Sequence, residues 1–154
     1  MTVIRRGGQQ DVPFMRSMLT HAYNWHVNVF DTEVPIARYV DGWGRPGDTV
    51  LIAMEGGHRV GAGWFRLFRE SAPAYGFIDE HTPEVTIAVV PTRQGEGIGQ
   101  ELLKGLLDQA RAENFRAVSV SVEKNHPEVA AYEAEGFEHV GETPHAVVLR
   151  RTLG

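Results

Sequence analysis

Residues 84–113 constrain the fold more than any other part of the chain. An apolar run typical of a buried strand covers residues 84–90, and apolar residues recur at helical spacing over residues 97–113. Between them lies a turn with three alternating glycines, Gly95, Gly97 and Gly99. Glycine leaves the backbone amides open to a ligand, and the first N–H groups of a helix are unpaired and carry a partial positive charge. This order therefore predicts an anion site, most often for phosphate or pyrophosphate.

Three phosphate-binding schemes compete for this turn. A P-loop requires Gly-Lys-Ser/Thr at its end, but Gln100 and Glu101 follow Gly99. A dinucleotide fingerprint requires G-x-G-x-x-G, whereas these glycines are spaced G-x-G-x-G. The remaining pattern is Gln94-x-x-Gly97-x-Gly99. The alternative is a glycine-rich turn without a ligand, which the flanking strand and helix make the less favoured interpretation.

Length and composition predict one soluble domain over residues 1–154. A chain of 154 residues is long enough to bury a core, and 42% hydrophobic and 23% charged residues are ordinary for a globular protein. No stretch has the length of a membrane helix, and no signal-peptide pattern begins the chain. With no cysteine there is no disulfide and no thiol nucleophile, which fits a cytoplasmic protein.

Charge and histidine spacing bear on the partners. The formal net charge is −5, without a long basic run, so we do not expect nucleic acid as a partner. The seven histidines show no ligand spacing, so we do not expect a metal site. The sequence leaves open whether the chain forms a homodimer.

The remaining patterns predict a mixed α/β sheet. A helix capped by Asp11 carries an apolar stripe through Ala22, and further helices are expected over residues 33–40, 97–113 and 128–134. Strands are expected over residues 3–4, 50–54, 59–68, 84–90, 117–122, 137–140 and 145–150. Strands with helices between several of them favour a layered α/β architecture.

Two motifs resemble those of the GNAT superfamily of N-acetyltransferases. The pattern Gln94-x-x-Gly97-x-Gly99 is similar to the family's pyrophosphate loop, Gln/Arg-x-x-Gly-x-Gly/Ala. The stretch from Asn125 through Tyr132 to Phe137 is similar to its second motif, Asn…Tyr-x-x-x-Gly-Phe, at the family's distance. The resemblance implies a GNAT-like α/β (α+β) fold. Its central sheet would be mixed and mostly antiparallel, with about seven strands flanked by about four helices, and splayed between the fourth and fifth strands.

The resemblance implies acetyl-CoA as the cosubstrate. The pantetheine arm would pair with the strand at Ile87, Ala88 and Val89, and the N–H of Val89 would polarise the thioester carbonyl. The pyrophosphate would lie on the amides of the glycine turn. Family members often carry Asn immediately before Pro in the second motif, where this chain has His126, so Asn125 and His126 are both candidates. The predicted coenzyme-binding residues are Ile87, Ala88, Val89, Gln94, Gly95, Glu96, Gly97, Ile98, Gly99, Gln100, Asn125 and His126.

Tyr132 and Glu84 are the predicted catalytic residues. Tyr132 corresponds to the family tyrosine near the coenzyme sulfur, a general acid for the leaving thiolate, and the alternative is an aromatic packing residue. Glu84 begins the coenzyme strand, where the family often places a general base. Strand alternation puts Glu84 on one face with Thr86 and Ala88.

Other residues compete for the acceptor side of the site. Asp79, Glu80 and His81 lie just upstream of Glu84 and are further candidates for the base; for each, a solvated loop charge is the alternative. Four aromatic residues are candidates for the acceptor pocket: Tyr23, Trp25, Trp43 and Tyr75.

The leading functional hypothesis is an acetyl-CoA-dependent N-acetyltransferase. It would move the acetyl group to a primary amine by direct attack, since the absence of cysteine disfavours a thiol-bound acyl intermediate. The partner would be a small-molecule or peptide amine. A non-catalytic acyl-CoA-binding or regulatory module on the same fold is the second hypothesis, and a nucleotide-binding module is the third. The acceptor stays open among a metabolite, an antibiotic, a peptide N-terminus and a lysine.

Overall fold

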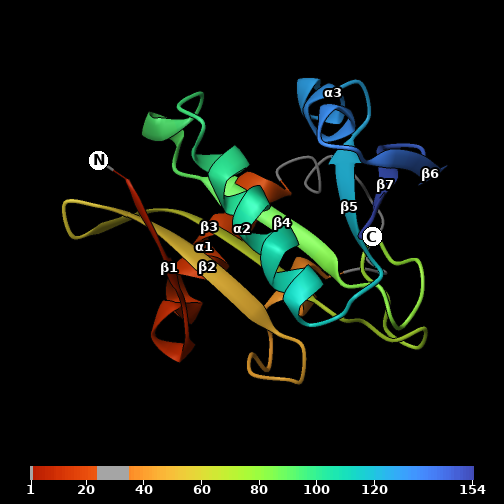
Figure 1. Cartoon of the computed structure of the whole chain (residues 1–154), viewed down its shortest axis with the longest axis horizontal. Coiled ribbons are helices and arrows are strands. Elements are labelled where there is room, and N and C mark those ends of the chain that lie inside the picture. Colours follow the sequence, from red (N-terminus) through yellow and green to blue (C-terminus); the bar gives the residue numbers. More distant parts are fainter. Residues whose placement is uncertain (1, 24–34) are drawn as a thin grey trace.

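The computed structural model describes residues 2–23 and 35–154. Seven strands form the sheet shown in Figure 1, and three α-helices pack around it. The helices are α1 (Val12–Ala22), α2 (Ile98–Ala112) and α3 (Pro127–Ala134), with short 3-10 segments η1 (Gln9–Asp11), η3 (Ile36–Tyr39) and η4 (Pro91–Arg93). The strands are β1 (Val3–Arg6), β2 (Thr49–Glu55), β3 (His58–Arg66), β4 (Glu84–Val89), β5 (Ala117–Glu123), β6 (Glu138–Glu142) and β7 (Ala146–Thr152).

The strand order confirms a mixed, mostly antiparallel sheet. The order is β1-β2-β3-β4-β5-β7-β6, and the β4–β5 pair is parallel. β3 and β4 pair along β4 from Glu84 to Val89, whereas β4 and β5 pair at one position, Glu84↔Ser119. β4 and β5 are thus neighbours with a single paired position, which is the arrangement expected of a sheet splayed between these two strands.

The expected helix over residues 33–40 is not confirmed. Residues 33 and 34 lie outside the described residues, and the described part is the 3-10 segment Ile36–Tyr39. There the Val40 N–H donates to the Ala37 carbonyl at 3.0 Å, an i→i+3 bond. The described part of the chain therefore carries three α-helices where about four were expected.

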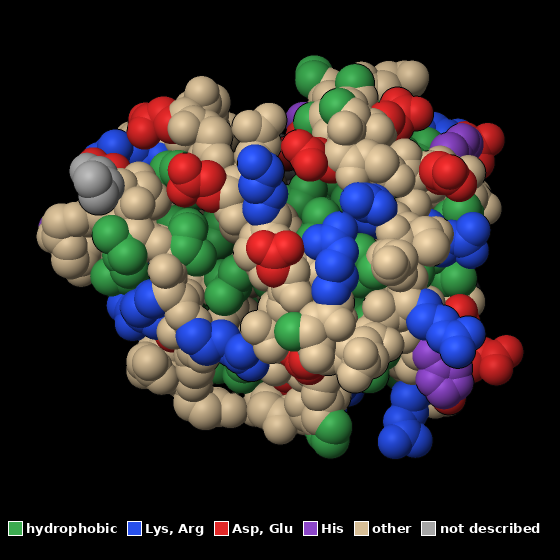
Figure 2. All heavy atoms as spheres, viewed as in Figure 1, with side chains coloured by type: hydrophobic (Ala, Val, Ile, Leu, Met, Phe, Trp, Pro, Cys, Tyr) green, Lys and Arg blue, Asp and Glu red, His purple; other side chains and the backbone are tan. Residues whose placement is uncertain are grey.

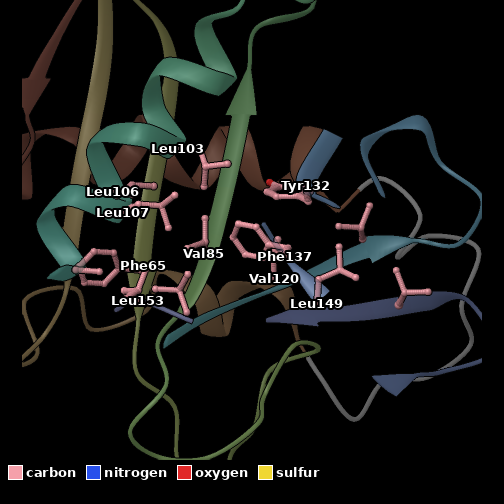
Figure 3. Packing of buried hydrophobic residues seen from close by; sticks show 14 residues of the cluster. Phe65, Val85, Leu103, Leu106, Leu107, Val120, Tyr132, Phe137, Leu149 and Leu153 are labelled. Carbon is pink, nitrogen blue, oxygen red and sulfur yellow. The ribbon is translucent and has the colours of Figure 1, made fainter. Parts of the chain in front are cut away.

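The two long helices cover opposite faces of the sheet (Figure 1). α2 packs on the side where Val85 lies opposite Phe65, and α1 on the side where Thr86 lies opposite Trp64. Because alternate residues of β4 face opposite sides, Glu84 and Thr86 lie under α1. Figure 3 shows the α2 side of the core, where Leu103, Leu106 and Leu107 face β4 while Val120, Phe137 and Leu149 fill the space around β5.

Acidic and basic side chains are interspersed over the face that carries α2 (Figure 2). Among the described residues, no helix is both long enough and apolar enough to cross a membrane.

Candidate active site

A cleft of about 500 Å³ opens where β4 and β5 part. It is bounded by β4, the glycine loop and the start of α2 on one side, and by β5 and α3 on the other, with the last turn of α1 at one end. Its lining residues are His21, Ala22, Ile87, Ala88, Val89, Gln94, Gly95, Gly97, Gly99, Gln100, Leu103, Ser121, Val122, Glu123, His126, Glu128, Ala131, Tyr132 and Glu135.

The glycine loop is shaped to receive an anion. Gly95 and Gly97 have φ values of 84° and 83°, a left-handed conformation that side chains disfavour, and Gly97 caps α2. A Cβ at Gly95 would meet no heavy atom within 4 Å, and one at Gly97 would meet only the Gln100 amide oxygen at 4.0 Å. The helix N-terminus therefore faces open space in the cleft, which fits a pyrophosphate group.

The edge of β4 offers backbone groups to an extended ligand. The Val90 N–H donates to the Val60 carbonyl at 2.9 Å, which fixes the alternation of the β3–β4 ladder. Ile87 and Val89 are therefore the residues whose N–H and C=O groups turn away from β3. The Gln94 side chain donates to the Val89 carbonyl at 3.2 Å and ties the loop to this edge.

Nine of the predicted coenzyme-binding residues lie together in the cleft, namely Ile87, Ala88, Val89, Gln94, Gly95, Gly97, Gly99, Gln100 and His126. Three do not line it. Glu96 forms an ion pair with Arg93, Ile98 is buried in the core, and Asn125 is exposed.

The second motif places His126 rather than Asn125 against the cleft. Asn125 has a positive φ of 62° and turns the chain into α3. His126 caps that helix, because its Nδ1 accepts the Glu128 N–H at 3.1 Å.

Tyr132 is both a packing residue and part of the cleft wall. The residue is 9% exposed, and its ring lies edge-on to Phe137, with centroids 5.2 Å apart (Figure 3). Burial, and then the nearby Glu128 carboxylate, raises the pKa of the Tyr132 phenol. The hydroxyl therefore carries its proton at neutral pH and can donate it.

Glu84 lies behind the cleft wall and is 1% exposed. Its Oε2 accepts hydrogen bonds from the Tyr39 hydroxyl at 2.5 Å and the Ser121 hydroxyl at 3.1 Å, and its Oε1 accepts the Gly76 N–H at 2.8 Å. Burial raises the pKa of Glu84 to about 7, against the effect of these hydrogen bonds. The carboxyl group therefore exchanges its proton near neutral pH.

The other candidates for the base lie in the connection before β4. The Asp79 carboxylate accepts the His81 N–H and the Thr82 hydroxyl, and the Glu80 carboxylate accepts the Glu70 N–H. None of Asp79, Glu80 and His81 lines the cleft.

Of the aromatic candidates, Tyr23 and Tyr75 lie together, with ring centroids 6.3 Å apart, and neither lines the cleft. Trp25 lies outside the described residues, and the Trp43 ring lies 5.1 Å from the Arg66 guanidinium. Tyr23 is buried, with its hydroxyl 2.8 Å from the Thr86 hydroxyl.

Sequence reasoning did not single out Ser121, Tyr39 or His21. Ser121 and Tyr39 are far from Glu84 in the chain and carry no motif, so only the fold brings them to it. His21 lies in the last turn of α1 at the end of the cleft. Among the described residues, no group of three or more His, Asp or Glu side chains is placed to hold a metal ion.

Known proteins match this chain over most of its length. The profile of the acetyltransferase (GNAT) family matches residues 13–137. The L-methionine sulfoximine/L-methionine sulfone acetyltransferase of Pseudomonas paraeruginosa is 25% identical over 92% of this chain and 83% of its own.

Solved structures show the same fold. The structure of yncA from Salmonella typhimurium with its cofactor acetyl-CoA superposes with a TM-score of 0.76 at 22% identity, covering 99% of this chain and 94% of that one. The ribosomal-protein-alanine N-acetyltransferase of Brucella melitensis superposes with a TM-score of 0.71 at 24% identity, covering 98% and 99%. The chain belongs to the GNAT family of acetyltransferases, and acetyl-CoA is its cosubstrate.

Proposed function

We propose that this enzyme transfers the acetyl group of acetyl-CoA directly to the primary amine of a small molecule. One observation carries the proposal. A single cleft brings together the free edge of β4, the glycine loop and the Tyr132 phenol, and the Glu84 carboxylate lies one hydrogen bond behind its wall. These groups are the donor site, the acid and the base that direct attack by an amine requires.

The donor half is held by backbone groups. The amides from Gly95 to Gln100 bind the pyrophosphate at the N-terminus of α2. The outward backbone groups of Ile87 and Val89 pair with the pantetheine amides as a further strand would. Acetyl-CoA supplies an activated thioester, and the Val89 N–H polarises its carbonyl oxygen.

The reaction must remove one proton from the ammonium group of the acceptor and supply another to the departing thiolate. A primary amine arrives mostly as ammonium near neutral pH and must lose a proton to attack. Glu84 takes that proton, which is supported by its pKa of about 7. Tyr132 gives its phenolic proton to the departing thiolate, which is supported by its place on the cleft wall and by the proton that its hydroxyl holds at neutral pH.

The first acceptor class to test is a free amino-acid-like amine. Two Pseudomonas relatives, each 25% identical to the chain over 92% of its length, bear the name of L-methionine sulfoximine and L-methionine sulfone acetyltransferases. We therefore propose the α-amino group of a small amino acid analogue as the acceptor. We also propose a cytoplasmic location and a single domain over residues 1–154; a homodimer stays a prediction, which light scattering tests.

The test measures free thiol and product mass together. The enzyme is incubated with acetyl-CoA and with L-methionine sulfone, L-methionine sulfoximine or a peptide that begins with alanine. We expect the amount of CoA released to equal the amount of a product about 42 Da heavier than the acceptor, which is the mass that one acetyl group adds. Turnover of the peptide alone would refute the small-molecule acceptor. Coenzyme binding without turnover over a wide amine panel would instead favour the non-catalytic acyl-CoA module.

A further inference from the structure

Ser121 joins the cleft to the buried carboxylate. It lies in β5, its residue lines the cleft, and its hydroxyl donates to Glu84 Oε2 at 3.1 Å. Glu84 itself is 1% exposed and does not line the cleft. An amine bound in the cleft therefore meets the Ser121 hydroxyl before it can reach the carboxylate.

The other hydrogen-bond partners of Glu84 do not line the cleft. Gly76 gives its backbone N–H to Oε1, and the Tyr39 hydroxyl, which donates to Oε2, accepts the Tyr75 N–H at 3.0 Å. Tyr23, which follows the last residue of α1, also hydrogen-bonds toward the carboxyl group, with its hydroxyl beside Thr86. Among the residues that the structure describes, Ser121 is the one hydrogen-bond partner of Glu84 that also lines the cleft.

We propose that the Ser121 hydroxyl relays the proton from the bound ammonium group to Glu84. The ammonium N–H bond breaks as its proton bonds to Ser121 Oγ, and the original Ser121 O–H proton passes to Glu84 Oε2. The amine keeps its electron pair for attack, Ser121 ends as a neutral hydroxyl, and Glu84 ends as a neutral acid. This relay rests on the proposed amine acetylation and specifies how that site removes the proton.

The chemistry of the pair suits this role. A hydroxyl can accept one hydrogen bond while it donates another, so Ser121 can bind the ammonium and the carboxylate together. Among the described residues, the groups that hydrogen-bond to Glu84 are Tyr23, which follows α1, Tyr39 of η3, Gly76 in the connection before β4 and Ser121 of β5, and all are uncharged. The carboxylate is thus stabilised by neutral donors, and its pKa of about 7 leaves it able to accept a proton at neutral pH.

The same strand offers a matched control for mutagenesis. Ser119 lies two residues from Ser121 and is fully buried, and its hydroxyl has no hydrogen-bond partner among the described residues. It does not line the cleft. Ser119→Ala and Ser121→Ala therefore each remove one serine hydroxyl from the same face of β5, and only Ser121→Ala interrupts the relay.

The test measures kcat from pH 6 to 10 with L-methionine sulfone, or with whichever acceptor of the panel the parent acetylates. Ser121→Ala should lower kcat at pH 7 by about 10-fold to 100-fold, leave KM for acetyl-CoA within about twofold, and recover at high pH, where free amine needs no base. Ser121→Thr keeps the hydroxyl and should restore most of the rate, and Ser119→Ala should match the parent. Thermal stabilisation by acetyl-CoA checks that each variant is folded.

Three results would overturn the relay. The first is a kcat of Ser121→Ala at pH 7 that equals the kcat of the parent. The second is a kcat of Ser121→Ala that is lowered by the same factor at every pH and that Ser121→Thr does not restore. The third needs no variant: in mixtures of H₂O and D₂O, the transfer of two protons should give a curved dependence of kcat on deuterium fraction, and a straight line contradicts it. If the parent acetylates no acceptor at all, the proposed function fails and the relay fails with it, whereas an active parent with an unaffected Ser121→Ala variant refutes the relay alone.

Discussion

Burial of Glu84 predicts that Glu84→Gln changes how stability depends on pH. Glutamine has nearly the shape of glutamate and can still accept the Gly76 N–H, but it carries no charge at any pH. The parent must bury a carboxylate among Tyr39, Gly76 and Ser121, and no cation among the described residues lies beside it. The comparison therefore isolates the free energy of placing one negative charge at this position.

The magnitude follows from the pKa of Glu84. Burial raises it from an ordinary 4.5 to about 7, which corresponds to about 3 kcal/mol. Below pH 4.5 the carboxyl is protonated in both the folded and unfolded states and contributes no pH dependence. Between pH 4.5 and 7 the folded state binds the extra proton, so the free energy of unfolding falls as the pH rises. Above pH 7 the full penalty of about 3 kcal/mol applies to the parent and is absent from Glu84→Gln.

Urea unfolding at pH 5 and pH 8 measures this difference. Because about 0.8 kcal/mol of the penalty is already present at pH 5, the free energy of unfolding of the variant minus that of the parent should rise by about 2.5 kcal/mol between the two pH values. Other titrating groups are common to both proteins and cancel in the subtraction. Glu101→Gln is the control, because Glu101 is exposed on α2 and buries no charge. Parallel curves for the parent and Glu84→Gln from pH 5 to 8 would refute the buried carboxylate as a titrating group.

Three further predictions concern the cleft and its frame. Gly97→Ala should weaken acetyl-CoA binding at least about fivefold (about 1 kcal/mol or more of left-handed strain), whereas Gly99→Ala should bind normally, because its Cβ would make only ordinary contacts of 3.6 Å and 3.9 Å. Calorimetric titration compares the two variants. Tyr132→Phe should lower kcat by about 100-fold with little change in acetyl-CoA affinity; an unchanged kcat restores the packing role. Asp11→Asn should cost about 2 kcal/mol in urea unfolding, less than a fully buried pair, because its arginine partners are a third exposed. At acid pH the parent loses the same stabilisation, because hydrogen bonds from the arginines lower the pKa of Asp11.

The sequence predicted those parts of the fold that local patterns determine. The leucine spacing gave a helix over residues 97–113, and α2 runs over Ile98–Ala112. The apolar run over residues 84–90 became β4, and the glycine turn between them lines the cleft with Gly95, Gly97 and Gly99. Each of these signals lies within a few residues of the feature it predicts, so no knowledge of packing was needed.

Burial of the base required information that the local pattern lacks. Strand alternation correctly puts Glu84 and Thr86 on one face, but it does not say what covers that face. The cover comes from Tyr39 and Ser121, which are 45 and 37 residues away in the sequence. The helix expected over residues 33–40 shows the same limit, since its described part is a 3-10 turn whose Tyr39 packs against the sheet.

Asp11 and Glu84, both buried, show how neighbours decide whether a buried carboxylate titrates. Asp11 is fully buried and takes hydrogen bonds from Arg5 and Arg59 at 2.8 Å, which hold its pKa well below the usual range. It therefore stays ionised and joins β1, β3 and the start of α1. Glu84 is as deeply buried, but its partners are uncharged, so burial prevails and its pKa rises to about 7. A single arginine beside Glu84 would offset the penalty of about 3 kcal/mol and would also remove its capacity to take up a proton near neutral pH. The lack of a cation is thus costly for stability and necessary for a base, which is why we assign proton transfer to Glu84 and a structural role to Asp11.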